Sequence, residues 1–141
     1  MSIDGLADAD IADILTTTKR VAVVGASAKQ ERASYYVPAF LAQKGKTIVA
    51  VNPGVAGQSM HSQTAVASLA EAAPLDMVYI FRAADQVGPI VDEAIKLGAK
   101  TIWLPLDIVD EAAAERARAA GLRMAMDRCA LVEWPRLKLP A

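Results

Sequence analysis

The stretch of sequence that most constrains the fold is a short apolar run that stops at a glycine. Residues Val21 to Val24 are small or β-branched, and Gly25 follows them directly. An apolar run of this length, bounded by glycine, is typical of a strand that is buried on both faces. A loop of small and polar residues comes next, and a helix is expected to begin near Ser34. This order opens a nucleotide-binding βαβ unit, in which phosphate binds at the helix N-terminus.

Strands and helices are expected to alternate along the chain. Strands are predicted at residues 20–25, 46–51, 75–81, 100–104 and 122–126. Helices are predicted at residues 6–18, 34–44, 84–97 and 109–120, with a helical turn at 68–72 and a short C-terminal helix or tail. Asp4 is expected to cap the first helix, and residues 54–64, rich in Gly, Ser and Gln, to form a loop. The pattern predicts an α/β fold with a Rossmann-like, doubly wound sheet of five parallel strands.

Length and composition fit one domain of this kind. The chain has 141 residues, which is enough to bury a full hydrophobic core. Hydrophobic residues make up 54% of the chain and aromatic residues only 5%, so the excess is largely Ala and Val. Such small side chains suit helices that lie close to a parallel sheet. No internal repeat or linker divides the sequence, so a single domain is expected over residues 1–141, with its core at 10–138.

Charge and cysteine content exclude several classes of function. The net charge is −1, so no broad basic surface is expected that would bind nucleic acid or an anionic membrane. The single cysteine excludes an internal disulfide framework and fits a reducing compartment. No apolar stretch approaches the length of a membrane span, and residues 1–18 carry acids where a secretion signal would be basic. A soluble cytoplasmic protein is therefore expected.

Polar or conformationally special residues follow the predicted strands, although the strands themselves are almost wholly apolar. Ligands of an open parallel sheet bind beyond the carboxyl ends of its strands. The segments at these ends are Gly25-Ala26-Ser27, Asn52-Pro53, Phe81-Arg82, Pro105-Leu106-Asp107 and Asp127-Arg128. This contrast predicts a ligand site at that edge of the sheet.

The loop after the first strand is suited to a diphosphate. Gly25 removes a Cβ where backbone would approach a ligand, and Ser27 and Ser34 offer hydroxyl donors. Arg32 places a fixed cation beside the expected helix N-terminus. The alternative is a tight turn that uses Gly25 for its dihedral angles, with Arg32 simply solvated.

Two common nucleotide-binding motifs do not fit this loop. A dinucleotide-binding fingerprint needs a second and a third glycine, but the loop reads Gly25-Ala26-Ser27-Ala28-Lys29-Gln30. The second strand ends at Asn52, where the fingerprint would have a carboxylate for the ribose hydroxyls, so NAD is disfavoured. A Walker loop is excluded because no Gly-Lys-Ser/Thr follows the first strand.

These segments together carry a resemblance to a known family. The matching motifs are Gly25-Ala26-Ser27, Glu31-Arg32-x-Ser34-Tyr35, Val51-Asn52-Pro53, Phe81-Arg82, Trp103-Leu104 and Met126-Asp127-Arg128-Cys129. In their order and spacing, over residues 10–138, the chain resembles the small stand-alone CoA-binding proteins. The Rossmann-like domain of these proteins is similar to the CoA-binding domain of the succinyl-CoA synthetase α-subunit.

The resemblance implies that coenzyme A or an acyl-CoA lies across the strand ends. It places the diphosphate near Gly25, Ala26, Ser27, Arg32 and Ser34. It places the adenosine by Asn52 and Pro53, with Phe81 and Arg82 lining the other side. The chain also departs from the family: Gly54 stands where many members have Lys or Arg, Pro105 and Asp107 replace the usual Gln and Gly, and Tyr79 stands where an acid is common.

Binding without catalysis is the first hypothesis, because the sequence offers no nucleophile–base pair and no metal cluster. One alternative is an enzyme, either a lone acyl-CoA-handling domain or a small α/β enzyme that uses Asp107 or Asp127. The other is a protein-interaction domain whose nucleotide site has decayed. His61 is predicted to be a solvated loop residue. Cys129 is either a small core residue or a thiol that pairs with the CoA thiol. A homodimer contact through Trp134 is left open.

Overall fold

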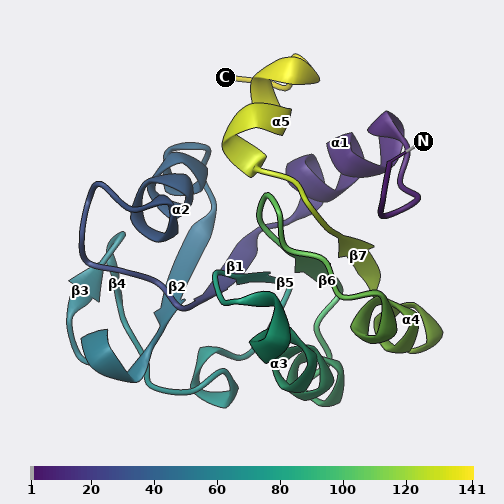
Figure 1. Cartoon of the computed structure of the whole chain (residues 1–141). Coiled ribbons are helices and arrows are strands. Elements are labelled where there is room, and N and C mark those ends of the chain that lie inside the picture. The colour runs from purple at the N-terminus through teal and green to yellow at the C-terminus, as the bar shows by residue number, and fades with distance from the viewer. Residues whose placement is uncertain (1) are drawn as a thin grey trace.

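The structure is a computed structural model and describes residues 2–141. Its centre is a sheet of five parallel strands in the order β2-β1-β5-β6-β7 (Figure 1). The strands are β1 (Arg20–Val24), β2 (Thr47–Val51), β5 (Met77–Ile80), β6 (Thr101–Trp103) and β7 (Arg123–Ala125). This confirms the predicted Rossmann-like, doubly wound α/β fold and all five predicted strands, with bounds that differ by a residue or two.

Helices cover both faces of the sheet (Figure 1). On one face lie α1 (Asp8–Thr17), α2 (Ala33–Gln43) and α5 (Ala130–Arg136), and on the other lie α3 (Ala84–Lys96) and α4 (Glu111–Ala119). Side chains of β1 alternate between the two cores: Val21 and Val23 pack with the first group of helices, and Ala22 packs with the second. No helix within residues 2–141 is long and apolar enough to span a bilayer.

Residues 54–64 are more ordered than the predicted loop. They contain a two-stranded antiparallel hairpin, β3 (Ser59–Met60) and β4 (Gln63–Thr64), preceded by the 3-10 turn η1 (Pro53–Val55). The two residues at the hairpin turn have positive φ angles, 53° at His61 and 68° at Ser62. The strands are short and mostly exposed, so no alternation of apolar residues marks them in the sequence. A second 3-10 turn, η2 (Ala70–Ala72), lies where a helical turn was predicted.

The prediction that Asp4 caps the first helix is wrong. The N-cap of α1 is Ala7, whose backbone N–H donates to the Asp10 carboxylate at 2.8 Å. Asp4 is buried and accepts two hydrogen bonds from the Arg128 guanidinium, at 2.6 and 3.0 Å. The N-terminal segment is therefore fastened to the residues that follow β7, far away in the sequence.

The order of the strands reverses between β1 and β5. From β1 the chain passes through α2 to β2 on one side, and it then returns past β1 to form β5 on the other side. Because α2 and α3 leave the sheet on opposite faces, the loops after β1 and β5 diverge, and ligands of such sheets bind at this point. Gly25 follows β1 and Phe81 and Arg82 follow β5, so three of the predicted site residues lie there.

Candidate ligand-binding site at the ends of the strands

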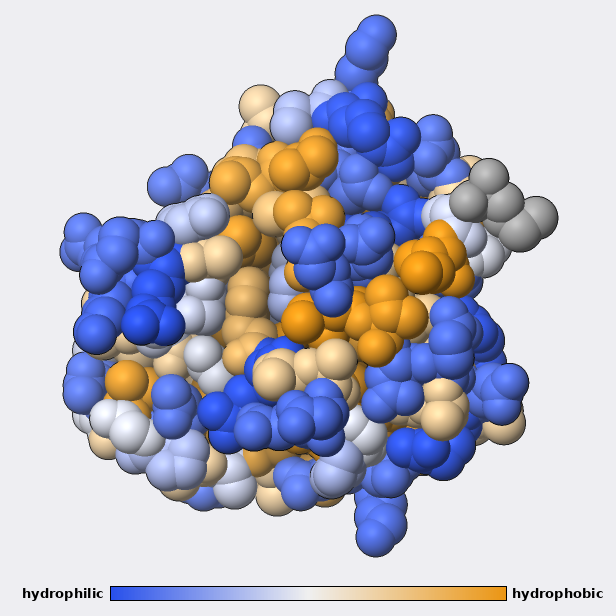
Figure 2. All heavy atoms as spheres, in the orientation of Figure 1, coloured by the Kyte–Doolittle hydropathy of each residue, from blue (hydrophilic) through white to orange (hydrophobic). Residues whose placement is uncertain are grey.

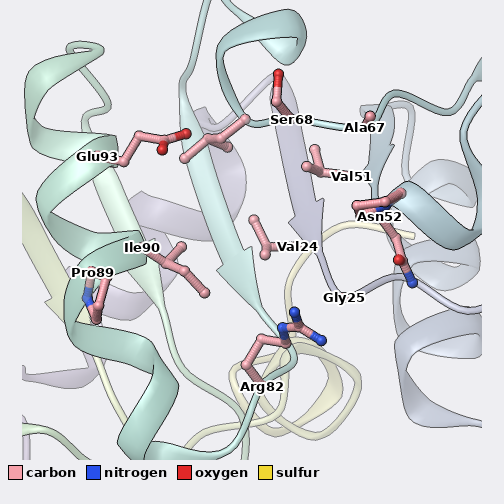
Figure 3. A pocket seen from close by; sticks show the side chains of 12 residues that line it. Val24, Gly25, Val51, Asn52, Ala67, Ser68, Arg82, Pro89, Ile90 and Glu93 are labelled. Carbon is pink, nitrogen blue, oxygen red and sulfur yellow. The ribbon is translucent and has the colours of Figure 1, made fainter.

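A pocket of about 350 Å³ lies beyond the ends of β1 and β2, on the face that α3 covers (Figure 3). Val24 and Ile90 form apolar walls in its middle. Gly25 and Arg82 lie at one end of the pocket, and Glu93 lies toward the other (Figure 3). Four predicted site residues line it: Gly25, Asn52, Pro53 and Arg82.

Gly25 is required by a close approach inside the protein. Its φ angle is +82°, and a Cβ at this position would lie 2.4 Å from the carbonyl oxygen of Phe81 and 3.2 Å from Cδ of Arg82. Its backbone N–H donates to the carbonyl of Val51 at 2.9 Å. Glycine here therefore lets the ends of β1 and β5 come together, and this amide is already hydrogen-bonded within the sheet.

Asn52 ties the two loops at the pocket to each other. Its side-chain amide nitrogen donates to the carbonyl of Ala26 at 2.9 Å, and its amide oxygen accepts from the backbone N–H of Gly54 at 3.0 Å. Asn52 thus fixes the shape of the pocket wall, and Pro53 continues this wall at the start of η1. Ala26 is only 1% exposed and does not line this pocket.

A second depression, of about 420 Å³, lies at the N-terminus of α2. Arg32 is the N-cap residue of α2 and Ser34 lies in its first turn, so both stand beside backbone N–H groups that lack helical partners. Arg32, Ser34, Phe81 and Arg82 are predicted site residues that line this depression, together with Ala33, Ala83, Pro105, Leu106 and Ile108. Figure 2 shows apolar surface in the middle of the view, where Figure 1 places the loop after β6.

Arg82 joins the two depressions, because its side chain lines both of them. The six ion pairs among residues 2–141 use Arg116, Arg123, Arg128 and Arg136. Arg32 and Arg82 take part in none of these pairs, so their positive charges are not neutralised by carboxylates of the described chain. An arginine in this state is suited to a phosphate group, which accepts paired hydrogen bonds from the guanidinium.

Ser27 is a predicted site residue in the loop after β1, and it lines neither depression. Its Oγ accepts a hydrogen bond from the backbone N–H of Lys29 at 3.0 Å. This bond shapes the loop after β1 and leaves the hydroxyl hydrogen of Ser27 available as a donor.

Tyr79 contacts both the start of α5 and the predicted site residue Phe81. Its hydroxyl oxygen accepts from the backbone N–H of Ala130, the first residue of α5, at 3.2 Å. Its ring is stacked on Phe81 with ring centroids 4.7 Å apart. Burial raises the pKa of Tyr79, so the phenol stays neutral. The tyrosine that the sequence left unexplained thus orients α5 and supports Phe81.

The residues of the first pocket that sequence reasoning did not assign to a site include Ser68, Ile90 and Glu93. Ser68 precedes η2, and its hydroxyl donates to the Glu71 carboxylate at 2.8 Å. Glu93 follows Ile90 by three positions on α3, so the two side chains lie on the same face of the helix. That spacing is the one available signal in the sequence, because an apolar residue such as Ile90 on a predicted helix is expected to face the sheet.

His61 differs from its prediction, and Cys129 packs partly buried against the core beneath α1, α2 and α5. The Nε2 atom of His61 is buried and has no hydrogen-bond partner within residues 2–141, and the ring lies 4.9 Å from that of Tyr35. His61 is thus half-buried in the hairpin turn and not fully solvated as predicted, and this burial lowers the pKa of its imidazole. Cys129 is partly exposed, and the Arg128 guanidinium beside it is paired with Asp4 and Glu133.

One family model and several similar proteins match most of this chain. The model of the CoA binding domain family matches residues 19–135. An uncharacterized protein of Bacillus subtilis strain 168, YneT, is 33% identical over 122 residues, which are 86% of this chain and 89% of the relative. A hypothetical protein from Pyrococcus horikoshii OT3 has a TM-score of 0.90 at 33% identity, covering 98% of this chain and 96% of its own. The Thermus thermophilus protein called cell-free ID.343 has a TM-score of 0.88 at 30% identity, covering 94% and 99%.

Proposed function

The chain belongs to the CoA binding domain family, and we propose that it binds coenzyme A or an acyl-CoA across the ends of its strands without catalysing a reaction. The observation that carries this proposal is the place of Arg82, whose side chain lines both depressions. Coenzyme A has a charged diphosphate between two less polar parts. A ligand with an anionic middle fits two depressions that share one unneutralised cation.

Each part of the ligand has a matching surface under this proposal. The diphosphate binds Arg82 and Arg32 beside the N-terminus of α2, where Ser34 adds a hydroxyl. The adenosine enters the first pocket, between Asn52 and the apolar side chain of Ile90. The pantetheine arm lies in the second depression, which is largely apolar.

The two carboxylates considered for catalysis lie outside both depressions. Asp127 accepts a hydrogen bond from the backbone N–H of Asp107 at 2.7 Å, and this bond joins the loops after β6 and β7. Both residues have positive φ angles, 68° at Asp107 and 57° at Asp127. Asp127 therefore has a structural task, and neither residue lines the two depressions that share Arg82.

The direct test is titration calorimetry of coenzyme A binding to the wild type and to Arg82→Ala and Arg32→Ala. Each substitution removes a charge-assisted hydrogen bond, so each is expected to weaken binding by about 1.5–3 kcal/mol. Arg123→Ala is the matched control, because Arg123 lies at the opposite edge of the sheet, where it pairs with Asp13. Its affinity should equal that of the wild type.

Three results would contradict the proposal in different ways. Unchanged affinity in both arginine variants would mean that the phosphates bind elsewhere. Tighter binding of NAD than of coenzyme A would overturn the ligand. No binding of coenzyme A, dephospho-CoA, ADP or NAD would favour the protein-interaction alternative.

A homodimer is a separate proposal that light scattering would test. Trp134 has little surface available for contact with a second subunit. This residue is 7% exposed, and its Nε1 donates to the carbonyl of Pro140 at 2.8 Å. A dimer would therefore use another surface of the protein.

A further inference from the structure

The first pocket is electrostatically polarised along its length (Figure 3). Arg82 lies next to Gly25 at one end, and Glu93 lies at some distance from it on α3. The wall between them is apolar, formed by Val24 and Ile90. Among the lining residues, all of which the structure describes, Arg82 is the one cation and Glu93 the one anion.

The end of the pocket near Ser68 and Glu93 offers hydrogen-bond acceptors. The hydroxyl hydrogen of Ser68 is donated to Glu71, so the lone pairs of Ser68 Oγ remain as acceptors. Glu93 takes part in none of the six ion pairs formed within residues 2–141. A ligand hydroxyl or amine would donate to these oxygens. A phosphate would instead face the negative charge of the Glu93 carboxylate.

We infer that this pocket selects an adenosine diphosphate ester whose ribose hydroxyls are free, and that Glu93 discriminates against a 3′-phosphate. The inference rests on the proposed function, because it takes the diphosphate to be at Arg82. With the diphosphate held there, the ribose and base extend along the apolar wall toward Ser68 and Glu93. The dephosphorylated form of coenzyme A is therefore the better ligand of this chain.

The residues that line the pocket include no second cation that could neutralise a 3′-phosphate near Glu93. Gly54, which follows the lining residue Pro53 in the sequence, has no side chain that could do so either. The carboxylate that the end of β2 does not supply for ribose hydroxyls comes instead from α3, on the facing wall. Two like charges a few ångströms apart in a hydrated pocket repel by about 1 kcal/mol, which is about a fivefold change in affinity.

The test compares ligands that differ only in the 3′-phosphate. Calorimetry on the wild type uses coenzyme A against dephospho-CoA, and 3′-phospho-ADP against ADP. The dephosphorylated member of each pair should bind about fivefold tighter or more. Glu93→Gln should bring the two members of each pair closer together, and Glu93→Lys should reverse their order. Glu115→Gln, an exposed residue of α4 that does not line the pocket, is the matched control and should keep the wild-type ratio.

The outcomes of these titrations separate a wrong ligand selectivity from a wrong proposed function. Equal or tighter binding of coenzyme A by the wild type overturns the selectivity alone. Glu93 variants that weaken both members of a pair equally also overturn it, because Glu93 would then not sense the 3′-phosphate. If no member of either pair binds the wild type, the proposed function and the selectivity fall together. The wild-type comparison stands even if a Glu93 variant does not fold.

Discussion

At the scale of the residue, Gly25 and Asn52 make structural contacts within the protein that do not depend on a ligand. Gly25 allows the ends of β1 and β5 to meet, and Asn52 joins the loops after β1 and β2 through both polar atoms of its side chain. Arg32 and Arg82 differ from them, because they line the second depression and take part in none of the six ion pairs among residues 2–141. The first pair builds the site and the second pair is available to bind.

Replacing Gly25 by alanine should destabilise the protein by about 2–5 kcal/mol. The backbone strain of a positive φ angle costs about 1–2 kcal/mol, and the clash of the new Cβ with the Phe81 carbonyl adds about 1–3 kcal/mol. Gly98→Ala separates the two effects, because Gly98 also has a positive φ of +80° but no atom within 4 Å of an added Cβ. Urea denaturation of both variants measures the difference. Equal losses of stability would show that the contact with Phe81 is not the reason for glycine.

At the scale of the element, the N-terminal segment and α5 are held against the sheet by a buried ion-pair network. The Asp4 side chain is fully buried and Arg128 is 10% exposed, and Arg128 also pairs with Glu133 of α5. Asp4 accepts further hydrogen bonds from the backbone N–H groups of Leu6 and Met126. One carboxylate thus fixes the start of the chain, the end of β7 and, through Arg128, the last helix.

This network predicts a loss of stability in acid. Burial raises the pKa of Asp4, but the hydrogen bonds from Arg128 and from backbone N–H groups outweigh it and hold the pKa at about 2, below the usual 3.8. The unfolded chain therefore binds the proton more readily, so the contribution of Asp4 is complete above pH 3.8 and is lost as the pH falls toward 2.

Asp4→Asn tests this dependence against the wild type. The difference in free energy of unfolding between the two proteins should be about 1–2 kcal/mol larger at neutral pH than near the folded-state pKa. Asp13→Asn removes an exposed ion pair with Arg123 and should change stability by less than about 1 kcal/mol. Urea denaturation across this pH range is the measurement. A difference that does not vary with pH would contradict the role of Asp4.

At the scale of the whole molecule, the two depressions draw their residues from both layers of helices and from the ends of four neighbouring strands. The lining comes from the ends of β1, β2 and β5, the loop after β6, the segment before η2, the start of α2 and the inner face of α3. A ligand that contacts all of these binds the folded state and not the unfolded chain, so it should stabilise the whole fold.

Coenzyme A or dephospho-CoA at about 100 times its dissociation constant should add about 2.7 kcal/mol of stability. For a chain of 141 residues this corresponds to a rise in melting temperature of roughly 6–10 °C. Differential scanning calorimetry with and without the ligand measures the shift, and Arg82→Ala at the same ligand concentration is the control with a smaller shift. A saturating ligand that leaves the melting temperature unchanged would contradict binding at this site.

The sequence by itself determined the strands, the fold class and the positions that follow the strands. Apolar runs such as Val21 to Val24 and the glycines after them are local signals, because burial on both faces of a strand requires such residues wherever the strand lies. That one edge of the sheet brings together Gly25, Asn52, Phe81 and Arg82 could also be predicted. These residues follow the strands, and the carboxyl ends of parallel strands meet at one edge of the sheet.

Only the tertiary structure decided what depends on contacts between distant segments. The partner of Asp4 is Arg128, and the polarity of the first pocket depends on Glu93 of α3 facing the end of β2. Neither contact leaves a pattern in the sequence, since a charged residue near a helix is typical of a solvated surface until the packing of that helix is known. The β3–β4 hairpin was missed because its strands are short and polar, and backbone hydrogen bonds between segments, which every residue type can make, hold it together.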